Sequence, residues 1–343
     1  MKNILITGGS GLVGKQLTAL LEQKGYAVAW LSRKPQQQTH FIWDVARQEI
    51  DSQAMEWADA VVHLAGEGVA EKRWTAERKQ AILRSRTEST ALLHRAIQQA
   101  RDKPSTFISA SAVGYYGFDT GAALVDESSA SGTDFLAEVV LAWEKEVKKI
   151  EALPLRCVIL RIGIVLDAQG GALAEMLKPP VAAPLGSGAQ WMSWIHVEDL
   201  VRLFVFALEK TTLQGIYNAV GPNPATNQQL TKEAAAAKGK TYLGIGVPGF
   251  ALKLVLGEML SQFNESQLEK FIYLQRTIAE NAVQFLKPGC PLVYITCSVF
   301  KEENEEAVAY FLANLPLKLE KMDLIKGYES KADTMFVARF LKH

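Results

Sequence analysis

A glycine-rich turn near the start of the chain constrains the fold more than any other segment. It follows the apolar run at residues 4–6, so it lies between an expected buried strand and an expected helix. Gly8 permits a tight turn, Gly11 lets a phosphate approach the backbone, and Gly14 lets the helix pack close to the strand. A tight turn without a ligand is the alternative. The predicted dinucleotide-binding residues are Thr7, Gly8, Gly9, Ser10, Gly11, Leu12, Val13 and Gly14.

The composition is typical of a soluble cytoplasmic enzyme with a small-molecule substrate. The chain has 343 residues, 48% of them hydrophobic, which is enough to bury a large core in two or more domains. Lys plus Arg and Asp plus Glu both number 37, and no apolar run reaches membrane-spanning length, so we expect neither nucleic acid nor a membrane as a partner. The cysteines lack metal-ligand spacing, so we expect no metal site. They are Cys157, Cys290 and Cys297.

Short apolar runs alternate with helical patterns along most of the chain. This alternation predicts an α/β fold with a doubly wound parallel sheet, Rossmann-like, whose ligand site lies at the carboxyl ends of the strands. We expect this domain over residues 1–166, completed by about 196–221, with a small substrate lobe over 167–195 and 222–259. The predicted strands are Ile4 to Thr7, Ala27 to Leu31, Ala60 to Leu64, Thr106 to Ala110, Cys157 to Ile162 and Ile216 to Val220.

The second predicted strand ends in basic residues about twenty positions after the glycine-rich turn, where NAD-binding proteins usually carry an acidic residue. Ser32, Arg33 and Lys34 stand there instead. Cations beside a hydroxyl suit the extra phosphate of NADP(H), so we expect NADP(H) to be favoured over NAD(H). Two solvated surface cations are the alternative. The other expected cofactor contacts are Asp44, Leu64, Ala65 and Gly66.

Five further segments carry recognisable motifs. They are His63-Leu64-Ala65-Gly66-Glu67, Lys72-Arg73-Trp74-Thr75, Ile108 to Gly117, Asp134 to Glu138 and Gln190 to Asp199. With the glycine-rich turn, they resemble the extended short-chain dehydrogenase/reductase superfamily, in its NAD(P)-dependent nucleotide-sugar epimerase branch, over residues 1–259. The resemblance implies an NADP-dependent oxidoreductase or epimerase that acts on a nucleotide-sugar-like or other polar carbonyl or hydroxyl substrate.

The resemblance also implies a catalytic serine and a Tyr-x-x-x-Lys pair, in which the phenol moves a proton while hydride moves at the nicotinamide. Ser111 matches the serine, but residues 135–140 read Phe-Leu-Ala-Glu-Val-Val and contain neither partner. We therefore expect Tyr115 or Tyr116 to replace the missing phenol, with both as pocket-wall residues as the alternative. A non-catalytic NADPH-binding or sensing protein is the second function class.

Substrate contacts are expected from cationic and aromatic residues outside the cradle. Arg161 lies near the end of the predicted strand Cys157 to Ile162, where it could bind a phosphate or carboxylate of the cofactor or substrate. The tryptophans are expected either to stack on a sugar or to belong to the core. The expected substrate residues are Lys72, Arg73, Trp74, Trp191 and Trp194.

Residues 260–343 follow another pattern. The predicted elements are helices over Asn264 to Leu286 and Glu302 to Leu312, and strands over Leu292 to Val299, Leu317 to Ile325 and Met335 to Leu341. Three segments, Leu292 to Ser298, Glu302 to Glu305 and Ala332 to Ala338, resemble the last part of Sun-type RNA cytosine-C5 methyltransferases. In that family the cysteine matching Cys297 attacks cytosine, but this chain has no second glycine-rich loop for a methyl donor.

We therefore expect the tail to be an inert C-terminal α/β half-domain with a structural role. An RNA-related function through it is the weakest alternative. Its apolar helix is expected to pack on three strands, with the strand near Leu292 in a central position and lacking a neighbour. An unpaired strand edge favours pairing, so a homodimer through the tail is a further expectation.

Overall fold

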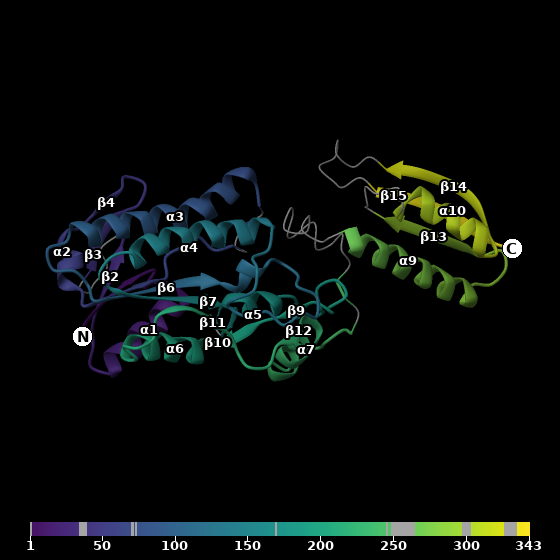
Figure 1. Cartoon of the computed structure of the whole chain (residues 1–343). Coiled ribbons are helices and arrows are strands. Elements are labelled where there is room, and N and C mark those ends of the chain that lie inside the picture. Colours follow the sequence, from purple (N-terminus) through teal and green to yellow (C-terminus); the bar gives the residue numbers. More distant parts are fainter. Residues whose placement is uncertain are drawn as a thin grey trace. The chain divides into compact units, whose positions relative to one another are not determined.

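The computed structural model divides the chain into two compact units, Met1–Val247 and Pro248–His343 (Figure 1). Each unit has its own hydrophobic core, and each is described by itself below. The domain bounds expected from the sequence stay predictions. The residues described by the structure are 2–33, 40–69, 72, 74–168, 170–244, 246–247, 265–296, 303–325 and 335–343.

The first unit is built on an eight-stranded sheet. Its strands are β1 (Asn3–Thr7), β2 (Ala27–Ser32), β3 (His40–Asp44), β4 (Glu49–Ile50), β5 (Ala60–His63), β6 (Thr106–Ala112), β7 (Arg156–Ile162) and β11 (Gly215–Ala219). Their order is β11-β7-β6-β5-β1-β2-β3-β4, and only the β3–β4 pairing is antiparallel. The predicted doubly wound parallel sheet is confirmed, and all six predicted strands are present.

Helices cover both faces of this sheet. One face carries α1 (Leu12–Gln23) and α6 (Val197–Glu209), and the other carries α3 (Ala76–Gln99) and α4 (Phe135–Glu151) (Figure 1). A short helix, α2 (Gln53–Trp57), precedes β5.

The α4 helix shows why these segments fold as they do. Asp134 caps it by accepting hydrogen bonds from the backbone N–H groups of Leu136 and Ala137. Its apolar residues then recur at helical spacing, so they share the face that packs on the sheet.

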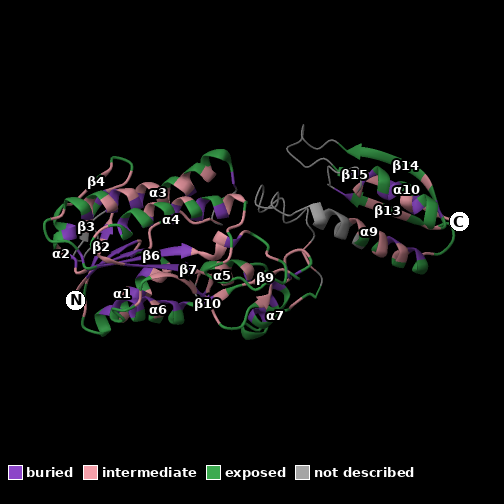
Figure 2. Cartoon of the chain, viewed as in Figure 1, coloured by how far each residue is buried: buried purple, intermediate pink, exposed green. Residues whose placement is uncertain are grey.

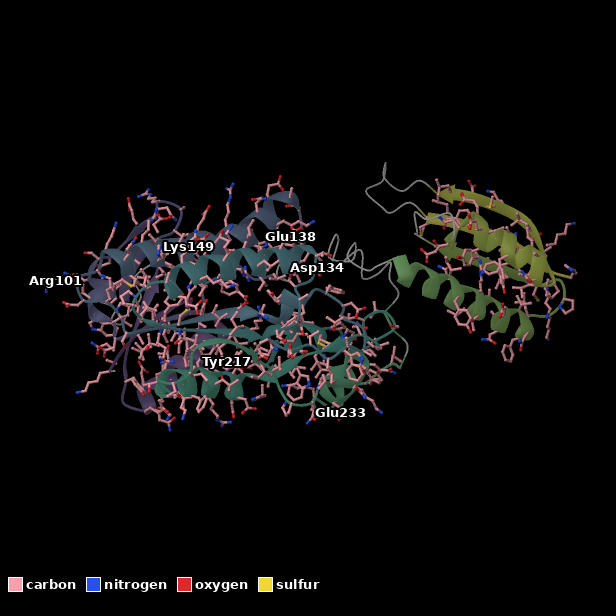
Figure 3. All side chains as sticks on the ribbon, in the orientation of Figure 1. Arg101, Asp134, Glu138, Lys149, Tyr217 and Glu233 are labelled. Atoms are coloured by element: carbon pink, nitrogen blue, oxygen red, sulfur yellow. The ribbon has the colours of Figure 1, made fainter. Side chains whose placement is uncertain are left out.

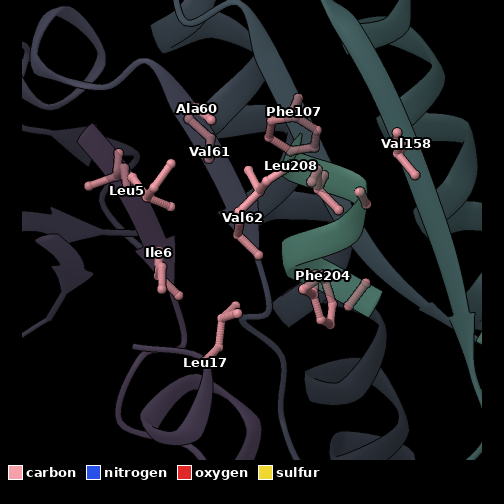
Figure 4. Packing of buried hydrophobic residues seen from close by; sticks show 14 of the residues in the cluster. Leu5, Ile6, Leu17, Ala60, Val61, Val62, Phe107, Val158, Phe204 and Leu208 are labelled. Atoms are coloured by element: carbon pink, nitrogen blue, oxygen red, sulfur yellow. The ribbon is translucent and has the colours of Figure 1, made fainter. Parts of the chain in front are cut away.

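The core lies where the central strands are covered on both faces. Parallel strands in that position are continuous apolar runs, and Leu5, Val61 and Phe107 are fully buried (Figure 4). Leu17 from α1 and Phe204 from α6 belong to the same cluster. Figure 2 shows these strands as buried and the outward faces of the helices as exposed. The carboxyl ends of β1, β5, β6 and β7 are therefore held by a rigid core.

A smaller set of elements follows β7. It contains β8 (Ile164–Leu166), α5 (Gly171–Met176), β9 (Trp191–Met192), β10 (Trp194–His196), β12 (Ala225–Thr226) and α7 (Asn227–Ala237). Strands β8 and β10 pair in parallel, whereas β9 and β12 pair antiparallel. Leu177, Ala182 and Ala235 form a small core of their own. Residues before β9 and after β12 thus pack together, although they lie far apart in the sequence.

The second unit is an antiparallel sheet with two helices. Its elements are α9 (Glu265–Phe285), β13 (Pro291–Thr296), α10 (Glu305–Asn314), β14 (Leu317–Ile325) and β15 (Met335–Lys342). The predicted helices and strands are confirmed where the structure describes them, and Phe311 and Phe340 are buried in the shared core. The strand order is β13-β15-β14, so the expectation of a central strand near Leu292 is wrong. Strand β15 takes the centre because it pairs with both neighbours.

None of the helices in the described ranges combines the length and the apolar character needed to cross a bilayer.

Candidate active site

The predicted dinucleotide cradle, residues 7–14, joins β1 to α1. Gly8 adopts a φ of +72°, and its carbonyl accepts a hydrogen bond of 3.0 Å from the N–H of Gly11. A Cβ at Gly14 would lie only 2.4 Å from that carbonyl oxygen, so no side chain fits there. Helix α1 begins after Gly11 with no side-chain cap and no acidic residue in its first turn. Its first amides can therefore bind an anion, and the cradle fits a dinucleotide pyrophosphate.

A hydrogen-bonded cross-link fixes the cradle to the loop after β5. The hydroxyl oxygen of Thr7 accepts hydrogen bonds of 3.1 Å from the backbone N–H groups of both Leu64 and Ala65. Its own proton therefore points to Nδ1 of His63, at 2.7 Å. A Cβ on Gly8 would lie 2.9 Å from the carbonyl carbon of Leu64, so the two loops are in direct contact.

His63 is neutral in this arrangement. Because Nδ1 accepts from Thr7, the ring proton lies on Nε2, which donates to the Thr90 hydroxyl at 3.0 Å. Complete burial, with a smaller effect from the charge of Arg86, lowers the pKa of His63 to about 3. Sequence reasoning included His63 only as part of a motif and missed this role.

The basic residues expected at the cofactor phosphate are only partly described. Ser32 is half-buried and Arg33 is exposed at the end of β2, while Lys34 lies outside the described residues. Arg33 lies close enough to Glu67 to affect it. The pKa of Glu67 is lowered first by a hydrogen bond from Arg78, and then by the charges of Arg78, Arg33 and Lys72.

Other predicted cofactor and substrate residues have structural contacts. The Asp44 carboxylate accepts from the backbone N–H groups of the two residues at 46 and 47, so it closes a local turn. Arg86 donates to the carbonyl of Glu67, and a Cβ on Gly66 would lie 3.2 Å from its guanidinium carbon. Lys72 is exposed, and Arg73 lies outside the described residues.

The structure brings the predicted Ser111, Tyr115, Tyr116 and Arg161 together around one unpredicted residue, Glu144. The hydroxyl of Ser111 donates to Oε1 of Glu144 at 2.7 Å. Arg161 donates through Nε and Nη2 to the same carboxylate, each at 2.8 Å. Arg161 and Glu144 are only 2% and 4% exposed, so this is a buried two-point ion pair.

The two tyrosines contact the same guanidinium differently. Arg161 donates from Nη1 to the phenol oxygen of Tyr116 at 3.0 Å, and that phenol donates to Asn218 Oδ1 at 2.8 Å. The guanidinium carbon of Arg161 lies 3.3 Å from the ring centroid of Tyr115. Burial alone would lower the pKa of Arg161, but the hydrogen bonds and charge of Glu144, with the bond to Tyr116, raise it above its ordinary value.

These six residues, Ser111, Tyr115, Tyr116, Glu144, Arg161 and Asn218, are called the Arg161 cluster below. Tyr116 is buried, and its phenol has a donor and an acceptor within the cluster. Tyr115 is half-buried and lines a cavity, and its hydroxyl makes no hydrogen bond to the part of the chain that the structure describes. Of the two phenols, Tyr115 is the one left available to a ligand.

Phe135 and Val139 stand where a tyrosine and a lysine would be expected. The Phe135 ring packs edge-on against Trp74 at 5.0 Å between centroids, and Val139 is buried. Trp74 is also buried, and its Nε1 donates to the carbonyl of Val69. These contacts make Trp74 part of the packing around the start of α4.

The predicted tryptophans are not gathered into one aromatic site. Trp191 is half exposed on β9, and Trp194 accepts a backbone hydrogen bond from Gly221. No ring contact joins them to each other or to Trp74 in the described ranges.

Comparisons with known proteins agree with this geometry. The profile of the NAD dependent epimerase/dehydratase family matches residues 4–163 and 168–219. The chain belongs to this family. It is 37% identical over 265 residues to Epimerase family protein YfhF of Bacillus subtilis, covering 75% of this chain and 86% of that protein. The predicted resemblance of the first unit is thereby confirmed.

Two solved structures are also similar. Human epimerase family protein SDR39U1, crystallised with NADPH, is 34% identical with a TM-score of 0.68, over 74% of this chain and 86% of that one. A nucleoside-diphosphate sugar epimerase from Corynebacterium glutamicum is 33% identical with a TM-score of 0.61, over 74% of this chain and 55% of that one. The 16S rRNA methyltransferase RsmB/F profile matches residues 259–343, which confirms the second resemblance.

Proposed function

We propose that the first unit is an NADP(H)-dependent oxidoreductase or epimerase that acts on a nucleotide-sugar-like or other polar carbonyl or hydroxyl substrate. One observation carries this proposal. At the end of β1, helix α1 starts without a side-chain cap, and Gly14 packs where no side chain would fit, an arrangement suited to an anion. The Arg161 cluster includes residues at the carboxyl ends of β6 and β7 in the same sheet. When bound, the dinucleotide would supply hydride transfer at its nicotinamide ring.

Different residues of the chain would bind the cofactor and move the proton. The amides at the start of α1 bind the pyrophosphate, and Ser32, Arg33 and Lys34 bind the extra phosphate of NADP(H). The human relative, which was crystallised with NADPH, supports this preference. Tyr115 exchanges a proton with the substrate, because its hydroxyl makes no hydrogen bond within the described chain and the residue lines a cavity. The Ser111 hydroxyl donates its hydrogen bond to Glu144, so Ser111 acts as a positioning residue.

The cofactor preference is tested by calorimetry with NADPH and NADH. We expect NADPH to bind more tightly, and Arg33→Asp to weaken NADPH selectively by roughly 1.5–3 kcal/mol, the scale of a hydrogen bond to a charged group. Arg101, labelled in Figure 3, follows the C-terminal end of α3. Arg101→Asp is the control, because it makes the same change of charge there and should leave the affinities for both cofactors unchanged. Equal affinities of the unmodified protein for the two cofactors would contradict the preference.

Turnover is tested with Tyr115→Phe. Loss of a general acid or base costs about two to four orders of magnitude in rate, whereas cofactor affinity should stay nearly constant. Tyr217 lies on the edge strand β11, and its hydroxyl donates to the carbonyl of Gln214, so Tyr217→Phe should have little effect. Full activity in both Tyr115→Phe and Tyr116→Phe, on an identified substrate, would exclude the two phenols as the proton source.

A non-catalytic NADPH-binding or sensing protein is the second candidate. The apolar packing of Phe135 on Trp74 and the burial of Val139 favour it, because neither position supplies a proton or a charge. Tight NADPH binding without turnover of any polar carbonyl or hydroxyl compound would select this function. A cytoplasmic location stays a prediction.

For the second unit we infer a structural role without methyltransferase activity. Cys297 lies outside the described residues, and β13 is at the edge of its sheet. A homodimer through this unit is tested by analytical ultracentrifugation of the full chain. Binding of S-adenosylmethionine, or methylation of RNA cytosine that is lost in Cys297→Ala, would overturn the inert role.

A further inference from the structure

A groove of about 520 Å³ lies beside α4, along the edge strand β11, and is called the α4 groove here. Its floor contains Glu144, Arg161 and the ring of Tyr115, and its walls include Leu141 and Ile216. Figure 3 labels Lys149 on α4 and Tyr217 on β11, each one residue beyond a residue of the groove. No residue of the cradle lines it, so the α4 groove is distinct from the pyrophosphate cradle.

The charges that line the α4 groove leave an excess of positive charge. Glu144 and Arg161 neutralise each other on the floor, and Glu127 accepts the backbone N–H of Asn218 at 2.6 Å. Lys145 and Lys148 both line the groove and are exposed. Neither has a carboxylate within ion-pair distance in the part of the chain that the structure describes.

The neighbouring lysine provides a useful contrast. Lys149 contacts the carboxylate of Glu146, at 2.7 Å, on the same helix. Lys149 does not line the groove and is paired with Glu146, whereas Lys145 and Lys148 line the groove and have no ion pair in the described chain.

The α4 groove also offers apolar surface. Leu141 is 40% exposed although α4 has an otherwise buried apolar face, and the Tyr115 ring lies against Arg161 at the bottom. Pockets for small molecules typically have volumes of about 300–1,000 Å³ and combine apolar walls with a few polar groups. The α4 groove has both properties.

We propose that the α4 groove binds an organic anion, with its phosphate or carboxylate at Lys145 and Lys148 and its apolar body against Leu141 and Tyr115. A ligand that reaches the floor touches the phenol assigned to proton transfer. The anion is therefore the substrate, or the anionic end of it. This assignment rests on the proposed function, but the binding itself can be measured without turnover.

Phenyl phosphate is the probe, because it joins a ring to a dianion. We expect the full chain to bind it in calorimetry, and the double variant Lys145→Gln/Lys148→Gln to bind it about tenfold more weakly or worse, the scale of one lost charge-assisted hydrogen bond. The matched control is Lys103→Gln/Lys149→Gln, which removes two exposed lysines outside the groove lining and should leave the affinity unchanged.

Leu141→Glu tests the apolar wall separately. The variant places a carboxylate beside the two lysines, so it should no longer bind phenyl phosphate. In a second measurement, on the unmodified chain, inorganic phosphate should bind more weakly than phenyl phosphate because it has no ring to contact the apolar wall. Equal binding of the two probes would overturn the role of the apolar wall. Unchanged binding in the double lysine variant would overturn the proposed site.

NADPH affinity separates this proposal from the proposed function. All the variants should bind NADPH as the unmodified chain does, and an unchanged unfolding midpoint in urea establishes that they fold. Normal NADPH binding without phenyl phosphate binding would overturn the α4 groove alone. Phenyl phosphate binding without any dinucleotide binding would overturn the proposed function but not the groove.

Discussion

The cradle and the Arg161 cluster lie at the carboxyl ends of strands in one parallel sheet, yet they contain different kinds of chemical group. The cradle consists of backbone amides and glycines that are contiguous in sequence, and a neutral histidine on the adjacent strand β5 supports it. The cluster consists of a buried ion pair and two phenols, contributed by segments that begin at β6 and end at β11.

The difference predicts two kinds of sensitivity. Steric change should damage the cradle, because its groups are already in contact. Loss of one charge should damage the cluster, because the remaining charge would stay buried without compensation. Substitutions that act on one region and spare the other can therefore test whether the two are independent.

The largest effect is expected for Glu144→Leu. It leaves the guanidinium of Arg161 buried without its carboxylate, which should reduce the free energy of unfolding by roughly 3–5 kcal/mol. The double variant Glu144→Leu/Arg161→Met removes both charges and should recover most of that loss. Urea denaturation measures both. If the single variant were as stable as the unmodified chain, the ion pair would not govern the stability of the cluster.

Gly14→Ala should have the next largest effect. The new Cβ would lie 2.4 Å from the Gly8 carbonyl oxygen, an overlap that backbone atoms must relieve. We expect a loss of about 1–3 kcal/mol in stability, together with much weaker NADPH binding. Gly244→Ala adds the same methyl group at an exposed position with no atom within 4 Å and should change neither quantity. Normal cofactor binding by Gly14→Ala would remove the steric argument for the cradle.

The sequence predicts local features of this protein well and distant ones poorly. The glycine-rich turn is contiguous, and each long strand of the main sheet is an apolar run bounded by turns, so both are predictable. Strands β4, β9 and β12 have only two residues each, too few for any periodicity to emerge. The expected position of β13 is wrong because strand order depends on pairings between segments far apart in the chain.

Glu144 shows the same limit at the candidate site. A glutamate in a helix is usually on a solvated face, and sequence reasoning does not select it. Its spacing from Val140 and Val147 does place it on the buried face of α4, a signal that could have singled it out. Its partners Ser111 and Arg161 could not be inferred, because only the packing of α4 on the sheet brings them together.

A pH-dependent effect is expected from His63, which lies on β5 beside the cradle. Its pKa is about 3 in the folded chain, below the ordinary value of 6.5, so the unfolded state binds the proton more strongly. The free energy of unfolding should therefore fall as the pH decreases below about 6.5, by roughly 1.4 kcal/mol for each unit until the pH approaches 3.

Urea denaturation at a series of pH values, with the unmodified chain and His63→Gln, measures this slope. His63→Gln removes the titrating group and should remove its contribution to the slope, whereas the control His94→Gln, on α3, should retain it. A profile that is the same in His63→Gln and the unmodified chain would contradict a neutral His63 between Thr7 and Thr90.

The smallest effect, about 1 kcal/mol, is expected for the helix cap Asp134→Ala. The Asp134 carboxylate accepts from the N–H groups of Leu136 and Ala137, and it also accepts from Phe118 at 2.6 Å (Figure 3). It thereby holds the loop that follows the two tyrosines of the cluster against the start of α4. Thr75→Ala is the matched cap variant on α3, because the Thr75 hydroxyl accepts a hydrogen bond from the backbone N–H of Arg78 that alanine cannot accept.

Both cap variants should lose similar stability in urea, but their functional effects should differ. Asp134→Ala releases the loop beside Tyr115, so it should lower turnover while NADPH affinity stays constant. Thr75→Ala disturbs the helix start whose Arg78 binds Glu67 near the cradle, so any functional change should appear in cofactor affinity. Equal changes in both measurements for the two variants would mean that the cradle and the cluster respond as one unit rather than as two.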